Sequence, residues 1–260
     1  MEIIMLLVVD VGNTNIAFGA YEENALAATW RMSTVKNKTS DEIGIFLLDI
    51  LKVKNIEKER ITDCIISSVV PPIMYSLTHA IRKYLAVEPL IVNNSMDFGL
   101  KIKYENAAEV GADRLVNAYA AYEMYGGPLV IIDFGTATTF CAVSDKGEYL
   151  GGAICPGVKI SLEALYENTA KLPRVDIGKP EHVIGASTVE AMKSGTFYSY
   201  VGGVDYIADK FKQELGEKTR VVATGGLARL ISEDSKLIDI VNPNITIDGL
   251  NMLYNKIKGR

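Results

Sequence analysis

The chain has 260 residues, of which 48% are hydrophobic and 23% charged, and its formal net charge is −5. This composition is typical of a globular protein with room for one large domain or two ordinary ones, and the acidic balance gives no general attraction to nucleic acid or acidic membranes. The longest apolar runs are of strand length, far short of the ~20 residues that a membrane-spanning helix needs.

The first half of the chain alternates between strand-like and helix-like patterns. Apolar and β-branched runs predict strands at residues 3–10, 15–21, 25–33, 64–70 and 90–92. Helical periodicity predicts helices at residues 41–53, 71–84 and 112–124. Ser40 or Asp41 is expected to cap the first of these helices, and Gly126-Gly127-Pro128 then interrupts the chain.

After this interruption the pattern begins again. Strands are predicted at residues 129–134, 137–144, 148–155 and 220–226, and helices at residues 156–168, 189–215 and 248–258. Asp10 matches Asp133 and Gly12 matches Gly135 at the ends of the corresponding strands. An internal duplication is the simplest explanation. We therefore expect an α/β fold of two similar halves, residues 1–126 and 127–260, with a ligand cleft between them.

The two matching turns carry the chemistry, in the stretches "VVDVGNTNIAFG" from Val8 and "IIDFGTATTFCA" from Ile131. Backbone N–H groups of a glycine-containing turn can cradle phosphate oxygens, and Thr and Asn side chains add donors. Asp10 and Asp133 would repel phosphate, so they make sense there only with a cation, usually magnesium in phosphoryl transfer. For one turn alone, the simpler interpretation is a hairpin whose polar side chains bind turn amides. Two copies, each at the end of a buried strand, favour phosphate binding.

Other catalytic patterns are missing from the sequence. It contains no G-x-x-x-x-G-K-[ST] or G-x-G loop and no G-x-S-x-G turn. His79 and His182 have no motif around them, and we interpret them as ordinary helix or loop residues. Cys64, Cys141 and Cys155 fall on apolar strands without a C-x-x-C pair, which predicts small core residues in a reducing compartment. Because the N-terminus also lacks the pattern of a signal peptide, we expect a cytoplasmic protein.

Further short motifs occur in order along the chain. They are "DVGNT" at 10–14, "EVGADRL" at 109–115, "DFGTA" at 133–137, "GGAICPG" at 151–157, "LP" at 172–173, "IGAST" at 184–188 and "TGG" at 224–226. The two aspartate turns resemble the phosphate motifs of the actin/hexokinase/Hsp70 ATPase superfamily, and the whole set resembles type III pantothenate kinase. The resemblance implies duplicated ribonuclease H-like halves with mixed sheets. It begins best at Met5, so that Met1 to Ile4 would be an upstream start or a short extension.

The resemblance implies ATP-dependent phosphorylation of the primary hydroxyl of pantothenate, the first step toward coenzyme A. It implies that Asp10 holds magnesium through water and that Asp133 binds a monovalent cation, potassium or ammonium. It also implies a homodimer with the substrate site near the subunit interface. The implied ATP contacts are Asp10, Val11, Gly12, Asn13, Thr14, Asn15, Ile16, Ala17, Gly135 and Thr136.

The implied pantothenate contacts are Tyr104, Gly111, Ala112, Asp113, Arg114 and Thr188, with Asp113 as the general base. A primary alcohol is a weak nucleophile at neutral pH, so a carboxylate that accepts its proton is useful. From spacing alone, Asp113 is at least as typical of a helix cap or first-turn acid, and Arg114 of a structural ion pair. Thr188 is equally typical of an N-cap. After Tyr104 the family often has Pro where this chain has Ala107.

Two other functions remain as alternatives. One is a regulatory nucleotide-binding protein, because this fold also serves ATP-driven switches. The retained "GADR" and "IGAST" segments favour an enzyme, since a switch needs neither a base nor a small-substrate pocket. The other is a kinase of a different small alcohol or acid, which residue chemistry alone does not distinguish.

Overall fold

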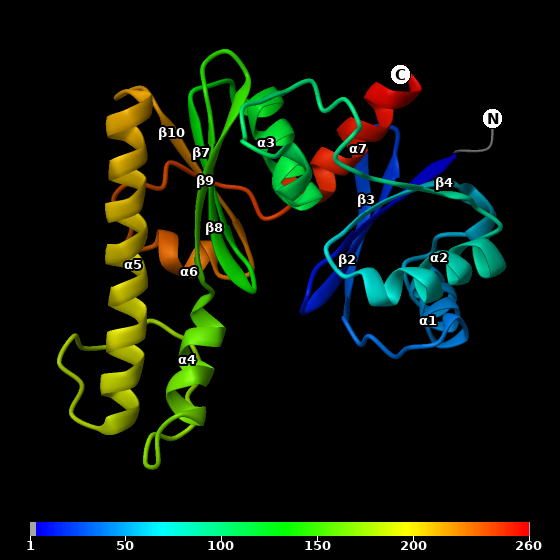
Figure 1. Cartoon of the computed structure of the whole chain (residues 1–260). Helices are drawn as coiled ribbons and strands as arrows, with labels where there is room; N and C mark the ends of the chain where they lie inside the picture. The colour runs from blue at the N-terminus through cyan, green and yellow to red at the C-terminus, as the bar shows by residue number, and fades with distance from the viewer. Residues whose placement is uncertain (1–3, 260) are drawn as a thin grey trace. The chain divides into compact units, whose positions relative to one another are not determined.

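The computed structural model describes residues 4–259 and divides into two compact units (Figure 1). The first unit contains the chain up to Gly99, Asn106–Ala120 and the segment from Ile245 onward, and the second contains Leu100–Glu105 and Ala121–Asn244. These units differ from the predicted halves in three places, because the C-terminal helix belongs to the first unit and residues 100–105 and 121–126 belong to the second. Most of the segment before Met5, which we predicted to be an upstream start or extension, lies outside the described residues.

The first unit is built on a five-stranded mixed sheet in the order β3-β2-β1-β4-β5. Its strands are β1 (Met5–Val11), β2 (Asn15–Glu22), β3 (Ala25–Ser33), β4 (Ile61–Ser68) and β5 (Pro89–Ile91). Strand β1 pairs antiparallel with β2 and parallel with β4. The helices are α1 (Ser40–Val53), α2 (Pro71–Leu85), the first part of α3 (Ala112–Tyr125) and α7 (Ile245–Lys258), with short 3₁₀ turns at Lys58–Arg60 and Ala107–Glu109.

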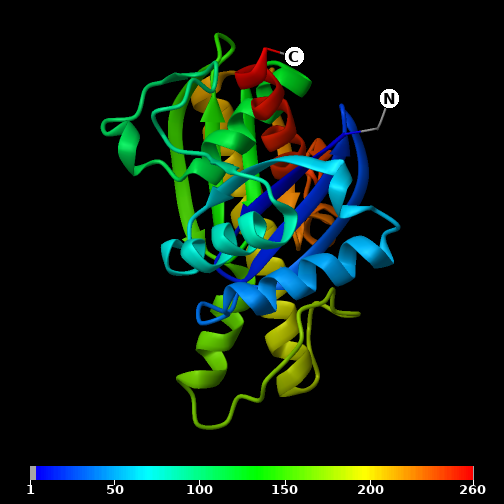
Figure 2. The same cartoon turned by 90° about the vertical axis from the view of Figure 1, so that its right-hand side faces the viewer.

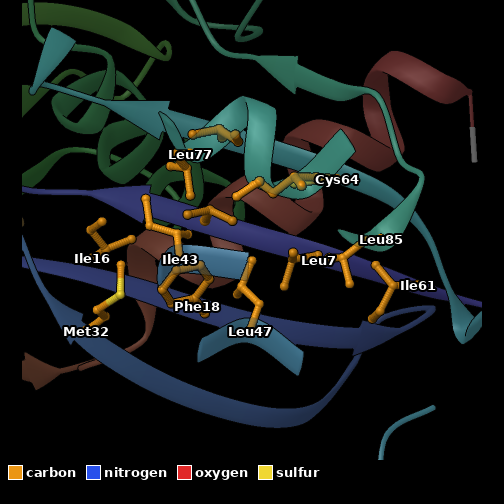
Figure 3. Close-up of a cluster of buried hydrophobic side chains, with 14 of the residues drawn as sticks. Leu7, Ile16, Phe18, Met32, Ile43, Leu47, Ile61, Cys64, Leu77 and Leu85 are labelled. Carbon is orange, nitrogen blue, oxygen red and sulfur yellow. The ribbon is translucent and has the colours of Figure 1, made fainter. Parts of the chain in front are cut away.

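One face of this sheet packs against α1 and α2. Alternation along β1 sends Leu7, Val9 and Val11 to this face, where they join Leu47 of α1 and Leu77 of α2 in one buried cluster (Figure 3). Burying an aliphatic side chain of this size contributes ~1.5–3 kcal/mol. This apolar layer therefore holds the two helices on the sheet and leaves the opposite face of β1 for other contacts.

Helix α1 begins with a cap that differs from the prediction. Its N-cap is Thr39 rather than Ser40 or Asp41. The Thr39 hydroxyl accepts a hydrogen bond from the backbone N–H of Glu42 (3.3 Å), and the Thr39 N–H donates to the Glu42 carboxylate (2.8 Å). This reciprocal capping box satisfies two backbone donors. The prediction was wrong because three consecutive residues have capping side chains, and only the backbone conformation selects one.

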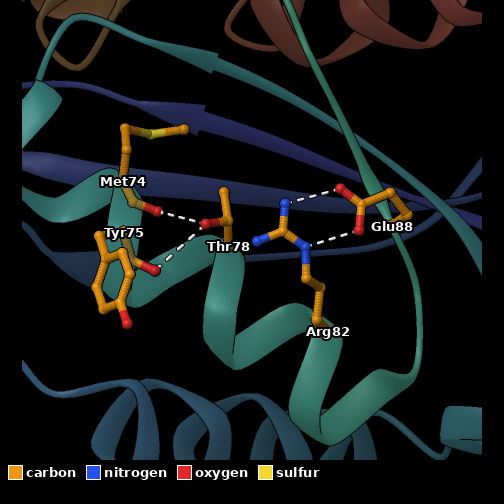
Figure 4. A network of polar contacts seen from close by, with 5 residues as sticks. All are labelled: Met74, Tyr75, Thr78, Arg82 and Glu88. Atoms are coloured by element: carbon orange, nitrogen blue, oxygen red, sulfur yellow. Dashed lines mark hydrogen bonds and ion pairs between the residues drawn. The ribbon is translucent and has the colours of Figure 1, made fainter.

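Helix α2 ends in a polar network that directs the chain toward β5 (Figure 4). Thr78 Oγ1 donates to the carbonyl of Met74 (2.8 Å), one turn earlier. Arg82 forms two hydrogen bonds with Glu88, from Nε to Oε2 (2.6 Å) and from Nη2 to Oε1 (2.7 Å). Glu88 immediately precedes β5, so this exposed pair bridges the turn around the left-handed cap residue Ala86 (φ 58°).

The second unit has a six-stranded mixed sheet in the order β11-β10-β7-β8-β9-β6. Its elements are β6 (Lys101–Ile102), β7 (Leu129–Phe134), β8 (Ala137–Val143), β9 (Glu148–Pro156), α4 (Val158–Glu167), α5 (Thr188–Leu215), β10 (Arg220–Gly225), α6 (Ala228–Ser232) and β11 (Ile240–Val241). Helix α5 packs through Phe197, Val201 and Val204 on this sheet. Its N-terminal turns extend with α4 beyond the end of the sheet (Figures 1 and 2).

The two sheets confirm the predicted α/β class and the duplication. The order β9-β8-β7-β10-β11 of the second sheet repeats the order β3-β2-β1-β4-β5 of the first. Strand β6 is an addition beside β9 that the sequence did not predict, because it has only two residues. Cys64 and Cys141 are buried and Cys155 is partly buried, and none of the three forms a disulfide. Among the described helices, none is both long and apolar enough to cross a membrane.

Candidate active site

The first candidate phosphate turn connects β1 to β2. Asp10 is the one residue of β1 that is not fully buried. After it the chain turns through Gly12, whose N–H donates to the carbonyl of Asn15 (3.0 Å). Asn13, Thr14 and Asn15 are exposed at the tip. The turn therefore presents polar side chains and backbone to solvent directly beside a carboxylate.

The apolar residues of this stretch that we predicted to contact ATP turn their side chains away from solvent. The side chains of Val11 and Ile16 are completely buried in the core of the first unit. Only their backbone groups remain to contact a nucleotide. Ala17 is partly buried and pairs with Asp10 across the β1–β2 ladder.

Thr34, just after β3, fixes this turn from the side. Its Oγ1 donates to the Gly12 carbonyl (2.7 Å), and its N–H donates to the Thr14 carbonyl (2.9 Å). Sequence inspection missed Thr34, because its contact depends on the register between β2 and β3. The residue therefore restricts the backbone at both ends of the exposed tip.

The second candidate turn connects β7 to β8 in the second unit. Asp133 lies near the end of β7, and the N–H of Gly135 donates to the Ala137 carbonyl (3.1 Å). The Thr136 carbonyl accepts from the N–H of Gly157, in the "GGAICPG" segment (3.1 Å). The second turn thus repeats the first in position and is braced by the chain that enters α4.

Gly225, at the end of β10, leaves space for the Asp133 carboxylate. Its φ is 91°, and a Cβ built on it would lie 2.6 Å from Asp133 Oδ1 and 2.7 Å from the backbone of Phe134. Such an approach is closed to any other residue. The "TGG" segment therefore packs closely against Asp133, a contact that the sequence did not predict.

The surroundings of both aspartates fit oxygen-ligated cations. At Asp133, the backbones of Gly135 and Gly225 come close to the carboxylate. A side chain at either position would occupy the space beside the carboxylate. Beside Asp10, the buried Ser67 hydroxyl has no hydrogen-bond partner among the described residues. No group of three His, Cys, Asp or Glu residues in the described chain is arranged to hold a metal. Magnesium in phosphoryl-transfer sites commonly uses one or two carboxylates together with water and phosphate, so a single aspartate is compatible with it.

Asp113 lies in the first turn of α3 and is partly buried. Its Oδ1 accepts a hydrogen bond from the backbone N–H of Arg114 (2.8 Å). Burial raises the pKa of this carboxyl above its ordinary value, while the hydrogen bond and the charge of Arg114 act in the opposite direction. A Cβ on Gly111 would lie 2.4 Å from Asp113 Oδ1, so glycine at this position lets the carboxylate fold back over the helix start. A carboxylate with a raised pKa is a better proton acceptor at neutral pH.

Asp113 and Asp10 belong to the same side of the first sheet. Helix α7 covers the face of β1 that includes Val8 and Asp10, since a Cβ on Gly19, the partner of Val8, would meet Ile247. Thr246 Oγ1 of α7 donates to Asn117 Oδ1 of α3 (2.7 Å), one turn after Asp113. The helix that carries Asp113 is therefore attached to the helix that covers the Asp10 face.

The loop before Asp113 is organised by Asn94, which the sequence did not single out. The Asn94 side-chain amide donates to the carbonyls of Ala108 (3.0 Å) and Val110 (2.7 Å). Asn106 caps the intervening 3₁₀ turn by accepting from the Ala108 N–H (3.2 Å). These bonds fix the backbone up to the residue before Gly111.

The remaining predicted substrate residues lie in the second unit. The exposed Tyr104 ring packs at 6.4 Å from the ring of Tyr149, with its edge against Gly151. Thr188 is exposed at the first position of α5. It is not the N-cap, because Ser187 occupies that position and its Oγ accepts from the N–H of Glu190 (3.2 Å). The capping interpretation of Thr188 is therefore wrong, and its hydroxyl has no assigned capping role.

Solved structures with this fold come from several functional groups. A protein of Sinorhizobium meliloti proposed to be a 2-dehydro-3-deoxygalactonokinase matches with a TM-score of 0.58 and 12% identity over 97% of this chain and 99% of that one. The ethanolamine utilization protein EutJ of Carboxydothermus hydrogenoformans matches with a TM-score of 0.55 and 14% identity over 95% and 89%. A conserved protein of Campylobacter jejuni proposed to be a Baf family transcriptional activator matches with a TM-score of 0.54 and 16% identity over 97% and 98%. These likenesses establish the actin/hexokinase-type ATPase fold.

The family follows from the sequence itself. The model of the family described as type III pantothenate kinase matches residues 6–210. The match includes both aspartate turns, the segment around Asp113 and Thr188. The chain belongs to the type III pantothenate kinase family and is a kinase.

Proposed function

We propose that this kinase transfers the γ-phosphoryl group of ATP to the primary hydroxyl of pantothenate and forms 4'-phosphopantothenate, the first step of coenzyme A biosynthesis. The family match carries the choice of substrate, since it spans residues 6–210. A cytoplasmic location is part of this proposal, and three cysteines without a C-x-x-C pair support it.

Asp113 is the general base in this proposal. The raised pKa of its carboxyl, caused by burial, supports proton transfer from an alcohol near neutral pH. Arg114, the next residue, supplies a positive charge toward the pantothenate carboxylate. Gly111 and Ala112 contact the substrate through their backbone.

The two turns bind the triphosphate. The N–H groups and side chains of Gly12 to Asn15 donate to phosphate oxygens, and Val11, Ile16 and Ala17 contribute backbone only. Gly135 and Thr136 donate from the second turn. Asp10 would hold magnesium, with water as further ligands, and Asp133 would hold potassium or ammonium; these cations would neutralise the charge of the phosphates. Alignment and charge neutralisation are the main requirements of phosphoryl transfer.

Tyr104 and Thr188 complete the pantothenate contacts. Tyr104 is 36% exposed although it packs on Tyr149, so part of its ring and its hydroxyl face solvent. Thr188 is exposed, and the capping of α5 by Ser187 leaves its hydroxyl available. Both positions thus offer a polar group that the fold itself does not require.

The active form is a homodimer in this proposal. Helices α4 and α5 line two cavities of about 390 and 360 Å³, which share Ser161, Ser199 and Tyr200. Large apolar side chains are exposed on these two helices and on the chain just before α5, where Ile184 is 88% exposed. Exposed apolar groups gathered in one region are typical of protein–protein contacts. Sedimentation of the wild type and of Ile184→Asp tests this, and a wild type that sediments as a monomer contradicts it.

The decisive experiment measures phosphopantothenate formation by the pure protein with ATP and magnesium, with and without potassium or ammonium. A panel of other small alcohols and acids run beside pantothenate separates a pantothenate kinase from a kinase of another substrate. A wild type that binds ATP but phosphorylates nothing in the panel under any cation supports the regulatory nucleotide-binding alternative instead.

A further inference from the structure

Ser67 lies beside Asp10 in the sheet of the first unit. The parallel ladder between β1 and β4 pairs Asp10 with Ser67, so the two side chains share one face. The preceding residues of β4, Cys64 to Ile66, are buried and apolar. Ser67 is also completely buried, and its Oγ has no hydrogen-bond partner within the described part of the chain.

A buried hydroxyl without a partner is unfavourable for the fold. Leaving such a group unsatisfied costs about 1–3 kcal/mol, and a bound water molecule or ion is one of the recognised explanations for such an exception in a native protein. Alanine at position 67 would satisfy the packing of β4 without this penalty. The hydroxyl of Ser67 therefore needs an explanation outside the packing of the first unit.

The neighbouring serine provides an internal comparison. Ser68 pairs with Val11, on the opposite face of the sheet. Its Oγ accepts a hydrogen bond from the backbone N–H of Val70 (3.1 Å), immediately before α2. Of these two adjacent serines, Ser68 thus has a structural role in the turn, whereas Ser67 faces the side of Asp10.

The second unit repeats the arrangement. The parallel ladder between β7 and β10 pairs Asp133 with Thr224, the residue before Gly225. Thr224 is 2% exposed. Each half therefore places a buried hydroxyl residue on the parallel strand next to its strand-end aspartate. This repeated placement is an observation separate from the missing hydrogen-bond partner of Ser67. It indicates that the aspartate sites themselves need a neighbouring hydroxyl group.

We propose that Ser67 is a positioning residue of the Asp10 site: its hydroxyl hydrogen-bonds a water molecule through which Asp10 holds the cation. This inference rests on the proposed function in one respect, since it takes the cation at Asp10 to be the magnesium of bound ATP. Mutation of a group that holds a metal ligand in place commonly lowers the affinity of a protein for the metal about 10–100-fold. We expect an effect of this size for Ser67. Thr224 is the corresponding residue at Asp133.

The test is a titration of Mn²⁺, followed by electron paramagnetic resonance, into the full-length protein with a nonhydrolysable ATP analogue. We expect Ser67→Ala to weaken Mn²⁺ binding about 10–100-fold and to raise the magnesium concentration needed for half-maximal activity. Ser68→Ala is the matched control and leaves both unchanged. Ser67→Thr keeps the hydroxyl, as at position 224, and restores binding. Thermal unfolding of Ser67→Ala should show no loss of stability, because the native hydroxyl has no hydrogen-bond partner among residues 4–259.

The outcomes separate this inference from the proposed function. Unchanged Mn²⁺ affinity in Ser67→Ala, with or without a lower melting temperature, overturns the role of Ser67 even if the wild type phosphorylates pantothenate. Weakened binding in Ser67→Ala supports the role even if the wild type is inactive on pantothenate. If Ser67→Ala does not fold, Ser67→Cys keeps the volume with a weaker hydrogen-bonding group, and unchanged Mn²⁺ affinity in that variant overturns the role.

Discussion

The side-chain amide of Asn94 donates a hydrogen bond to the carbonyl of Val110 (2.7 Å), across 16 positions of the chain. Val110 is followed by Gly111, and the Gly111 carbonyl accepts from the N–H of Arg114 at the start of α3 (3.1 Å). The chain segment after β5 thus fixes the backbone from which Asp113 projects. Any change in Asn94 should reach Asp113 through this path.

Asn94→Asp tests this connection, because it keeps the shape of the side chain but removes both amide donors. We expect the position of Asp113 to shift and kcat to fall by about 100-fold, as a displacement of ~1 Å can do. The matched control is Asn93→Asp. Asn93 Oδ1 accepts from the Ser95 N–H (3.0 Å), and an aspartate accepts equally well. Equal losses in both variants would mean that added charge, rather than the lost donors, is responsible.

Gly225→Ala should damage the Asp133 site. The new Cβ would lie 2.6 Å from Asp133 Oδ1, on a residue whose φ is 91°. Backbone strain of this kind costs of order 1–3 kcal/mol, and we expect weaker activation by potassium or ammonium in addition. Gly226→Ala is the control, since no atom lies within 4 Å of its Cβ position. Urea unfolding and cation titration check both effects, and wild-type behaviour of Gly225→Ala would contradict the close packing.

Asp113→Asn should change activity and stability in opposite directions. Loss of the base lowers kcat by roughly 10²–10⁴-fold. Burial raises the pKa of Asp113 in the folded protein, so its contribution to stability is present below the ordinary Asp value of about 4 and is lost as the pH rises through the raised pKa. The variant lacks this loss, so its stability relative to wild type should increase from pH 4 to pH 7.

Unfolding curves at several pH values measure this difference, with the exposed Asp49→Asn on α1 as the control. A variant whose stability relative to wild type does not increase from pH 4 to pH 7, or that retains full turnover, would remove Asp113 as a buried base. The asparagine still accepts the hydrogen bond from the Arg114 N–H, so the local backbone contact is kept.

Thr39→Ala should lower stability without affecting catalysis. It removes the acceptor of the capping box at α1, which typically stabilises by ~0.5–2 kcal/mol. Thr39→Ser keeps the hydroxyl and should behave as wild type. A changed kcat in Thr39→Ala, measured under conditions where the protein is fully folded, would show that α1 influences the site.

Ser187 and Thr188 should separate structure from substrate binding. Ser187→Ala removes the N-cap of α5 and should lower the melting temperature with little change in KM. Thr188→Val removes a hydroxyl outside the cap and should raise the KM for pantothenate about tenfold, the effect of one hydrogen bond of ~1.4 kcal/mol. A lower melting temperature in Thr188→Val, together with a higher KM in Ser187→Ala, would show that Thr188 rather than Ser187 caps α5.

The sequence alone predicted most elements of the fold. The runs that form β1, β7 and α5 are long and regular, and their bounds depend on neighbouring residues only. The repeat of Asp10 at Asp133 predicted the duplicated topology, which the order of the two sheets confirms. The cap of α1 was wrong because several adjacent residues had the same local preference.

Relations between distant segments were decided only by the tertiary structure. Pairing of Asp10 with Ser67, contact of Thr34 with Gly12, and the reach of Asn94 to Val110 each depend on strand register or loop closure. Helix α7 joins the first unit although it is last in the chain. Local patterns determine which residues form a strand or turn, because backbone preferences act over a few residues. Which side chain lies next to an aspartate is determined by how the whole chain packs, since burial and pairing act between segments far apart in the sequence.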